Sequence, residues 1–557
     1  MTKTSVNESS SAGARHVDAV VVGAGFAGLY MLLLLRDRLG LDVVGLEAAD
    51  GVGGVWYWNR YPGARCDIAS CDYSYSFSEE LQQEWTWPEK YPAQPDILAY
   101  LEHVAERFDL KRSFQFDTRV IRADFDERSN RWRIETAQGA RFVAKYFIPA
   151  TGVLSEGNVP EFKGRENFAG RSCFTGRWPK GGVDFSGKRV GIIGTGATAM
   201  QAIPIIAEQA AHLYVFQRTP SFGVPLQNEP MSAEEDRRIK AAYPQLRRAA
   251  RESIGGLSLL EARPSALADS PAERRAHYES RYQAGGFNVW FASYSDIFFD
   301  AAANETAAEF VREKIRARVR DPAVAELLCP RPGVTYGTKR QPCESGYFEA
   351  YNRDNVTLVD IRRAPIEEIT AQGLRTTDAS YDFDYLIYAT GFDAFTGALF
   401  RMNITGCRGL SLNEHWSAGP RSYLGIATSG FPNMFNITGP QSPSVFYNFP
   451  PGIEMHCEWI ADCIRHMEAQ GLARIDADAG HEAAWLRHIV ELADATLMPK
   501  ASSWYMGDNI PGKPRVFMFY LGGGQKYRAL IEQEAANRYP GFNFIAENTV
   551  QTGAAGE

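Results

Sequence analysis

Two stretches of the chain share one pattern of hydrophobic positions: a short apolar run, a glycine-rich turn, and then an apolar helical period. Residues 20–22 are three valines that enter the first turn, and residues 190–193 enter the second. A short run that is apolar at every position is typical of a strand buried on both faces of a parallel sheet. The pattern therefore predicts an α/β protein with two Rossmann-like dinucleotide-binding domains.

The first turn reads Gly23-x-Gly25-x-x-Gly28. Glycines are needed because the turn is tight, because the backbone must approach a pyrophosphate, and because the following helix must pack closely on the strand. A second strand, predicted over residues 41–46, ends in Glu47, whose carboxylate can accept hydrogen bonds from a ribose. This half of the chain is predicted to bind the adenosine of FAD.

The second turn reads Gly194-x-Gly196-x-x-Ala199, with alanine in the permitted third place. The next predicted strand covers residues 212–217 and leads directly to a basic residue. A glycine-rich turn can simply connect a strand to a helix. Two such turns with matching flanks favour two dinucleotide sites.

The two folds differ in the charge that follows their second strand. Glu47 and Arg218 each lie 24 residues after the first glycine of their own turn. An acid suits a free ribose hydroxyl, whereas an arginine suits a 2′-phosphate. Arg218, with the hydroxyl of Thr219 beside it, therefore predicts NADPH rather than NADH in the second fold.

Two further apolar runs, residues 147–152 and 386–391, each end in Ala-Thr-Gly. They are predicted to be strands that run back to a cofactor, where a small residue lets the backbone come close. This order indicates a chain that leaves the first domain, builds the second and returns. We expect a disordered tail over 1–16, an FAD-binding domain over 17–151 and 385–557, an NADP-binding domain over 152–222 and 332–384, and a helical insertion over 223–331.

The insertion shows two helix starts. Ser232-x-x-Glu235 and Ser270-Pro271-x-Glu273 are capping-box patterns, the second with proline at the first helical position. Charged and alanine-rich sequence follows each of them, and its arginines are expected on solvated helix faces.

Composition narrows the function classes. The chain has 557 residues, a net charge of −8 and no block of basic residues, so binding to nucleic acid or an anionic membrane through bulk charge is not expected. Its eight cysteines include no C-x-x-C pair, which argues against a zinc site, a redox dithiol or a secreted disulfide scaffold. Residues 19–35 lack charge, but three glycines interrupt them, as in a buried strand, turn and helix. We expect a cytoplasmic enzyme without membrane or nucleic-acid partners.

Residues 51–67 read GVGGVWYWNRYPGARCD. Together with the two turns, this tract resembles the flavin-dependent (type I) Baeyer–Villiger monooxygenases, which are FAD- and NADPH-dependent enzymes that insert oxygen beside a ketone carbonyl. The chain looks most similar to the phenylacetone and steroid monooxygenase type, and the resemblance covers most of its length. Further matching tracts are FQRTP (216–220), YGTKR (336–340), ATGFDA (389–394), SSWYMGDNIPGKPRVF (502–517) and LGGGQKYR (521–528).

The resemblance implies a reaction and its partners. NADPH reduces FAD, O2 adds to the reduced flavin, and the resulting peroxyflavin attacks a ketone to give an ester or a lactone. Sulfoxidation is a further activity that the resemblance implies. A small-molecule ketone and O2 are therefore the expected partners, and we expect a monomer or a weak homo-oligomer.

The resemblance also gives roles to single residues. Arg340, the last residue of YGTKR, matches the family's active-site arginine, whose fixed charge faces the negative charge that develops on oxygen. Asp67 matches the aspartate that orients this arginine. Lys339 is expected to grip the 2′-phosphate with Arg218, and Arg340 is also expected to contact the nicotinamide cofactor. Trp504 matches a tryptophan that meets the same cofactor.

Other side chains are expected to contact the flavin or the substrate, although packing in a core would explain an aromatic cluster among them equally well. The expected flavin contacts are Val55, Trp56, Tyr73 and Val120, and the expected substrate contacts are Phe446, Tyr447 and Phe449.

The family fingerprint Phe-x-Gly-x-x-x-His-x-x-x-Trp-Pro lies between the two folds, and Phe174 stands here in the place of the histidine. The other marked positions match. This departure leaves the flavin, NADPH and arginine sites unchanged but predicts altered coupling or domain motion. It keeps open a flavoprotein that oxidises NADPH and releases hydrogen peroxide. A flavin monooxygenase of sulfur or nitrogen substrates would share both turns but not the YGTKR tract.

Overall fold

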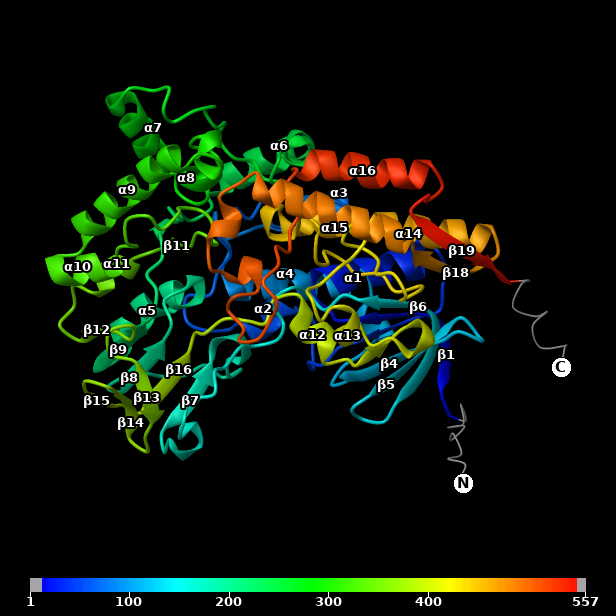
Figure 1. Ribbon diagram of the computed structural model, residues 1–557, viewed down its shortest axis with the longest axis horizontal. Coiled ribbons are helices and arrows are strands. Elements are labelled where there is room, and N and C mark those ends of the chain that lie inside the picture. Colours follow the sequence, from blue (N-terminus) through cyan, green and yellow to red (C-terminus); the bar gives the residue numbers. More distant parts are fainter. Residues whose placement is uncertain (1–12, 548–557) are drawn as a thin grey trace.

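Two sheets, each next to one of the glycine turns, organise the structure, which is a computed structural model describing residues 13–547 (Figure 1). The strands of the larger sheet are β1 (Arg15–Val22), β2 (Val43–Leu46), β3 (Phe114–Gln115), β4 (Val120–Asp126), β5 (Arg131–Thr136), β6 (Arg141–Pro149) and β17 (Ile404–Thr405). They lie in the order β17-β4-β5-β6-β1-β2-β3. Strands β6, β1, β2 and β3 are parallel, whereas β5 is antiparallel to both of its neighbours.

The central strand β1 is buried on both faces, as its run of valines predicts. Val21 packs in a core that includes α1 (Phe26–Leu33) and α14 (Phe449–Ala469). Its neighbour Val20 points to the opposite face, where it packs in a second core with Trp132. Successive side chains of a strand alternate between faces, so both faces of this one must be apolar.

The smaller sheet is parallel throughout. Its strands are β7 (Arg171–Phe174), β8 (Arg189–Ile193), β9 (His212–Gln217), β12 (Val356–Asp360) and β16 (Tyr385–Tyr388). They lie in the order β12-β9-β8-β16-β7. The second glycine turn joins β8 to α5 (Ala197–Gln209), and the strands predicted over 190–193 and 212–217 are confirmed.

The domain border predicted at residue 385 needs correction, because β16 belongs to the smaller sheet. Tyr388 pairs with Ile193 on β8 and with Phe174 on β7. An apolar run such as 386–388 fits a buried strand of either sheet, so its sequence did not distinguish them. The chain returns to the first half after this strand and not before it.

The region predicted as an insertion is mainly helical, with α6 (Ala233–Glu252), α7 (Pro271–Ala284), α8 (Asn288–Phe291), α9 (Ala301–Arg318) and α10 (Pro322–Leu328). Ser270 and Glu273 cap the start of α7 reciprocally. The side chain of Ser232 accepts the N–H of Glu235 at the start of α6. Both predicted helix starts are therefore confirmed, and Figure 1 shows α7 to α10 above the smaller sheet.

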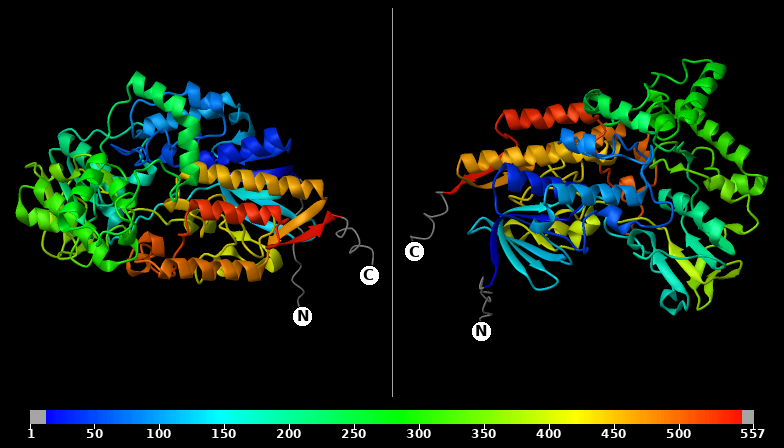
Figure 2. Two further views of the ribbon diagram at one scale, coloured as in Figure 1. Left: turned by 90° about the horizontal axis from the view of Figure 1, so that it is seen from above. Right: turned by 180° about the vertical axis from the view of Figure 1, so that it is seen from behind.

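Strand β1 begins at Arg15, so it enters the tail predicted over 1–16; residues 1–12 of that tail lie outside the described residues. Helices α14 and α16 (Gly524–Ala536) lie side by side over the larger sheet (Figure 2). Among the helices of residues 13–547, none combines the length and the apolar character that a membrane crossing requires. The remaining helices and strands are α2 (Val55–Trp58), α3 (Glu79–Glu84), α4 (Gln94–Arg107), α11 (Tyr347–Ala350), α12 (Thr396–Phe400), α13 (Leu412–His415), α15 (Ala479–Asp494), β10 (Val224–Pro225), β11 (Cys343–Glu344), β13 (Ile366–Ile369), β14 (Gly373–Thr376), β15 (Ser380–Asp382), β18 (Leu472–Ala477) and β19 (Phe542–Ala546).

Candidate active site

One cavity of about 1030 Å³ extends from the first glycine turn to the helical insertion. Both halves of the chain and the insertion line it. The predicted site residues in its wall are Gly23, Gly25, Glu47, Val55, Trp56, Asp67, Tyr73, Val120, Arg340, Phe446, Tyr447, Phe449 and Trp504. The predicted residues outside this wall are Gly28, Gly194, Gly196, Ala199, Arg218, Thr219 and Lys339.

The first glycine turn closes around backbone atoms and leaves no room for side chains. Gly23 has φ +110°, and a Cβ on it would lie 2.6 Å from the carbonyl oxygen of Ala150. A Cβ on Gly28 would lie 1.7 Å from the carbonyl oxygen of Gly23. Gly28 therefore serves helix packing, whereas Gly23 and Gly25 face the cavity, as expected of a dinucleotide turn.

Glu47 sits at the end of β2 and is tied to the same turn. Its Oε2 accepts the N–H of Ala24 at 2.7 Å, and its Oε1 accepts the N–H of Ala49 at 2.7 Å. Burial raises the pKa of this carboxyl, and the backbone donors oppose that rise. Each carboxylate oxygen can accept a further hydrogen bond, so the group is positioned to bind a ribose.

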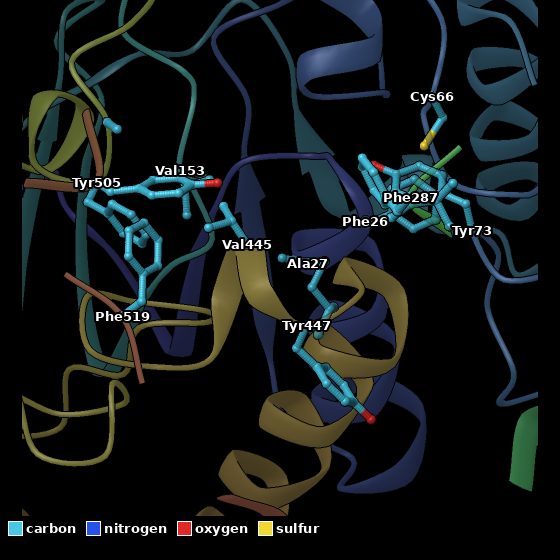
Figure 3. Close-up of a cluster of buried hydrophobic side chains, with 14 of the residues drawn as sticks. Phe26, Ala27, Cys66, Tyr73, Val153, Phe287, Val445, Tyr447, Tyr505 and Phe519 are labelled. Atoms are coloured by element: carbon cyan, nitrogen blue, oxygen red, sulfur yellow. The ribbon is translucent and has the colours of Figure 1, made fainter. Parts of the chain in front are cut away.

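The tract that follows builds an aromatic wall. Trp56, on α2, donates its indole N–H to the hydroxyl of Tyr73 at 3.1 Å. The ring of Tyr73 in turn meets Phe26 edge-on, with centroids 5.4 Å apart (Figure 3). Flat, rigid surfaces of this kind suit a planar ring system. Trp56 and Tyr73 are therefore joined on one side of the cavity.

Arg340 and Asp67 come together in the cavity wall. A guanidinium nitrogen of Arg340 lies 3.4 Å from Oδ2 of Asp67, and Phe287 lies under the guanidinium, 4.7 Å from its ring centroid. Burial raises the pKa of Asp67 to about 6, against the opposing effect of Arg340. A cation held this way can stabilise negative charge on an oxygen without reorganising.

The insertion contributes to this site, which the sequence reasoning did not predict. Trp290 donates its indole N–H to the carbonyl of Gly337 at 3.1 Å, and so fixes the turn that carries Arg340. Gly337 has φ +74°, and a Cβ on it would lie 2.6 Å from Trp290 Nε1. Phe287 follows the Gly285-Gly286 pair, where α7 ends. Two adjacent glycines predict the end of a helix, but they do not indicate which residues Phe287 contacts.

The second glycine turn repeats the first in its geometry. Gly194 has φ +115°, and a Cβ on it would lie 2.3 Å from the carbonyl oxygen of Ala389. The two predicted Ala-Thr-Gly runs therefore meet the first glycine of each turn in the same way. By contrast, no other part of the described chain comes within 4 Å of a Cβ built on Gly196, which leaves open space of the kind a pyrophosphate needs.

This difference gives a matched pair of variants. We expect Gly194→Ala to destabilise the fold by at least about 2 kcal/mol, because alanine is strained at positive φ and its methyl group meets a carbonyl. Gly196→Ala should keep the melting temperature but raise the KM for NADPH by roughly tenfold, because the methyl group enters the nucleotide space. Thermal melts and initial rates measure both. Equal melting temperatures for the two variants would contradict the assignment.

The two cations predicted to bind a 2′-phosphate lie close to each other. Arg218 and Thr219 are exposed at the end of β9. Burial lowers the pKa of Lys339, and the charge of Arg218 lowers it further. A phosphate dianion between these groups would relieve their repulsion, so the residues present fit a phosphorylated dinucleotide.

The predicted substrate residues differ in their surroundings. Phe446 belongs to an aromatic group with Tyr505 and Phe519, with centroids 5.1 and 5.4 Å from its own. Trp504 joins the group through Phe519 at 5.9 Å. Tyr447 is 3% exposed, and its ring is directed away from this group (Figure 3).

Phe174 fills a narrow space next to the chain segments that link the two halves. A Cβ on Gly157 or on Gly176 would lie 2.3 or 2.6 Å from its ring. The ring also meets Phe392 edge-on at 5.9 Å. The side chain that replaces the fingerprint histidine is therefore packed as an apolar wedge.

The first fold has a buried carboxylate at the end of its second strand, the second fold has two cations near its glycine turn, and a half-buried arginine lies in the cavity. These features are those of a pyridine-nucleotide-dependent flavoprotein. The profile of the family described as flavin-binding monooxygenase-like matches residues 16–226. A Baeyer–Villiger monooxygenase of Pseudooceanicola batsensis is 44% identical over 516 residues, which are 92% of this chain and 94% of that one. A phenazine N-monooxygenase of Lysobacter antibioticus is 42% identical over 529 residues, 95% of this chain and 97% of that one.

The structure of an oxidised steroid monooxygenase bound to NADP has a TM-score of 0.90 at 50% identity, with 95% of this chain and 99% of that one covered. The chain belongs to the flavin-dependent Baeyer–Villiger monooxygenases. The predicted fold class, the FAD and NADP cofactor pair and the predicted enzyme class are confirmed.

Proposed function

We propose that the chain uses NADPH and O2 to insert one oxygen atom next to the carbonyl of a small-molecule ketone, giving an ester or a lactone. The observation that carries this proposal is the Arg340–Asp67 pair, 3.4 Å apart, in a cavity lined from both dinucleotide halves. When bound, FAD reduced by NADPH supplies the activation of O2. The family membership of the chain supports the same reaction.

In this proposal the two glycine turns bind the two cofactors. The turn with Glu47 binds FAD, and the turn followed by Arg218 binds NADPH. The proposed FAD contacts are Gly23, Gly25, Gly28, Glu47, Val55, Trp56, Asp67, Tyr73 and Val120. The proposed NADPH contacts are Gly194, Gly196, Ala199, Arg218, Thr219, Lys339, Arg340 and Trp504. The proposed ketone contacts are Phe446, Tyr447 and Phe449.

Arg340 is the proposed catalytic residue. Its guanidinium stays charged at any working pH, and it faces the oxygen atoms that become negative during the reaction. Asp67 and Phe287 hold the guanidinium from two sides. Because the pKa of Asp67 is about 6, the ion pair is half formed near that pH, approaches completion as the pH rises above it, and is lost as the pH falls below it.

A labelled-oxygen assay tests the proposal. We expect the purified holoenzyme to convert at least one of a set of cyclic, linear and steroid ketones to an ester that carries one 18O atom from 18O2, with nearly one ester formed per NADPH. Mass spectrometry and hydrogen peroxide assays give this balance. Hydrogen peroxide in a one-to-one ratio to NADPH with every ketone would reject the proposal and favour the oxidase that Phe174 keeps open.

Nitrogen oxygenation is a second candidate, because a phenazine N-monooxygenase is 42% identical over nearly the whole chain. The same assay separates it. An N-oxide of phenazine formed in preference to any ester would favour this activity.

We also propose a cytoplasmic monomer or weak homo-oligomer. All eight cysteines are free and seven are buried, which supports a reducing compartment. For the domains, we propose the division given by the sequence, except that the border predicted at residue 385 is moved beyond β16.

A further inference from the structure

One side chain of the second fold, Gln201 on α5, holds the tract that carries Asp67. Its Nε2 donates to the carbonyl of Arg65 at 3.1 Å and to Oδ1 of Asp67 at 3.3 Å. Its Oε1 accepts the hydroxyl of Tyr61 at 2.8 Å and the N–H of Arg65 at 3.4 Å. A glutamine amide has two N–H groups and two acceptor positions, so all four are used.

The backbone of Gln201 meets the same tract. Gly63 has φ +77°, and a Cβ on it would lie 2.4 Å from the carbonyl oxygen of Gln201. The tract therefore lies directly against α5, with no space for a side chain between them. This contact joins the two dinucleotide folds at the residues that lead to Asp67.

The same helix begins at the second glycine turn. Gln201 lies five residues after Gly196, which is about 7.5 Å along a helix axis. A rigid helical segment therefore connects the turn that is proposed to bind NADPH with the amide that contacts Asp67. A displacement of α5 at the glycine turn also moves Gln201, because a helix of this length moves as a stiff body and does not bend.

We propose that Gln201 is a positioning residue that couples the second dinucleotide turn to the Arg340–Asp67 pair. It holds the Asp67 carboxylate where Arg340 needs it and favours the ionised form by donating a hydrogen bond. This role deepens the proposed function and rests on it for its catalytic consequence. Its effect on the ionisation of Asp67 can be measured without any ketone.

The surroundings of Asp67 make that measurement interpretable. The other titratable groups that face it are Arg340, Cys66, Cys343, Tyr61 and Tyr91. Burial raises the pKa of both thiols and both phenols, so these four groups stay neutral at working pH. Arg340, the backbone N–H of Cys343 and the Gln201 amide are therefore the groups that oppose the effect of burial on Asp67, and Gln201 is the one of the two neutral donors that a side-chain substitution can remove.

Two substitutions separate position from charge. Gln201→Met keeps a similar volume but removes all four hydrogen bonds. Gln201→Glu keeps both acceptor contacts, replaces the donor with a second carboxylate facing Asp67, and so disfavours its ionisation. Gln209→Glu makes the same chemical change at an exposed position of the same helix and serves as the matched control.

The experiment follows the flavin absorbance of the oxidised holoenzyme between about pH 5 and about pH 9, in the range where a carboxyl with a raised pKa titrates. We expect a transition near pH 6 that Asp67→Asn removes, that Gln201→Glu moves upward by about one unit, and that Gln209→Glu leaves in place. With a ketone that the wild type converts, Gln201→Met should yield roughly tenfold less ester per NADPH, while flavin content stays normal.

Failure of the two proposals is distinguishable. A wild type that converts no ketone would reject the proposed function, yet the titration would still decide the role of Gln201. An unchanged transition in Gln201→Glu, or no transition that depends on Asp67, would overturn that role. An ester yield per NADPH in Gln201→Met equal to that of the wild type would also overturn it.

Discussion

Arg340→Ala is expected to bind FAD and to remain reducible by NADPH, yet to lose ester formation by at least about a thousandfold. The oxygen atoms that react become negative beside this guanidinium, and the removal of one fixed donor from such a site costs several kcal/mol of transition-state stabilisation. Arg340 also balances Asp67, which lies 3.4 Å away. Without it, the buried carboxyl takes up a proton at higher pH.

Stopped-flow reduction and product analysis separate the two half-reactions of this variant. Arg331→Ala is the matched control, because Arg331 is exposed and lies just ahead of the same motif. It should retain both reduction and ester formation. An Arg340→Ala enzyme that makes ester at the normal rate would show that the guanidinium does not act on the reacting atoms.

Glycine turns and their flanking strands could be predicted because each is a local pattern. The valines before Gly23 and the β9 sequence before Arg218 fix strand, turn and charge within about thirty residues of chain. The structure places both first glycines against an alanine carbonyl, that of Ala150 or Ala389. In the sequence, this similarity between the two turns is visible as the two Ala-Thr-Gly runs that begin at Ala150 and Ala389.

The domain border at 385 could not be predicted for the opposite reason. The run Tyr385–Tyr388 is apolar at nearly every position, and a strand of this kind fits any sheet that is covered on both faces. The choice between sheets is made by pairing with β7 and β8, whose paired residues lie 214 and 195 positions earlier in the chain. Hydrophobic period contains no information about such partners.

Parts of the candidate site were missed because they are tertiary contacts. Phe287 and Trp290 come from a region whose sequence predicts helices and solvated faces, yet they contact Arg340 and Gly337. The sequence around Gln201 is that of an ordinary helix, and nothing in it indicates that the side chain contacts the carboxylate of Asp67. A sequence motif identifies residues that act together within a short segment. It does not identify residues such as Gln201, whose proposed role is to position a side chain from a distant segment.

Phe174 is the one marked position at which the chain departs from the family fingerprint, and this departure itself carries information. The fingerprint predicts an imidazole at this position, and the structure has an apolar ring packed against Gly157, Gly176 and Phe392. The ring fills the space between these residues and offers no hydrogen bond. Altered coupling between the halves stays a prediction, and the ratio of hydrogen peroxide to ester tests it.

The double variant Arg218→Ala, Lys339→Ala is expected to raise the KM for NADPH by at least about a hundredfold while changing the KM for NADH by less than about threefold. Each charge-assisted contact to a phosphate contributes about 1.5–3 kcal/mol, and NADH lacks the group that these contacts would bind. Steady-state rates with both nucleotides measure the change. Equal effects on NADPH and NADH would reject the phosphate assignment.

The single variants should not add up to the double one. Burial lowers the pKa of Lys339, and Arg218 lowers it further. Removing Arg218 therefore raises that pKa and strengthens the charge that remains, so Lys339 compensates in part for the loss. Removing both cations ends this compensation, and the double variant should lose more NADPH affinity than the product of the two single effects. Simple additivity would mean that the two side chains bind different parts of the nucleotide.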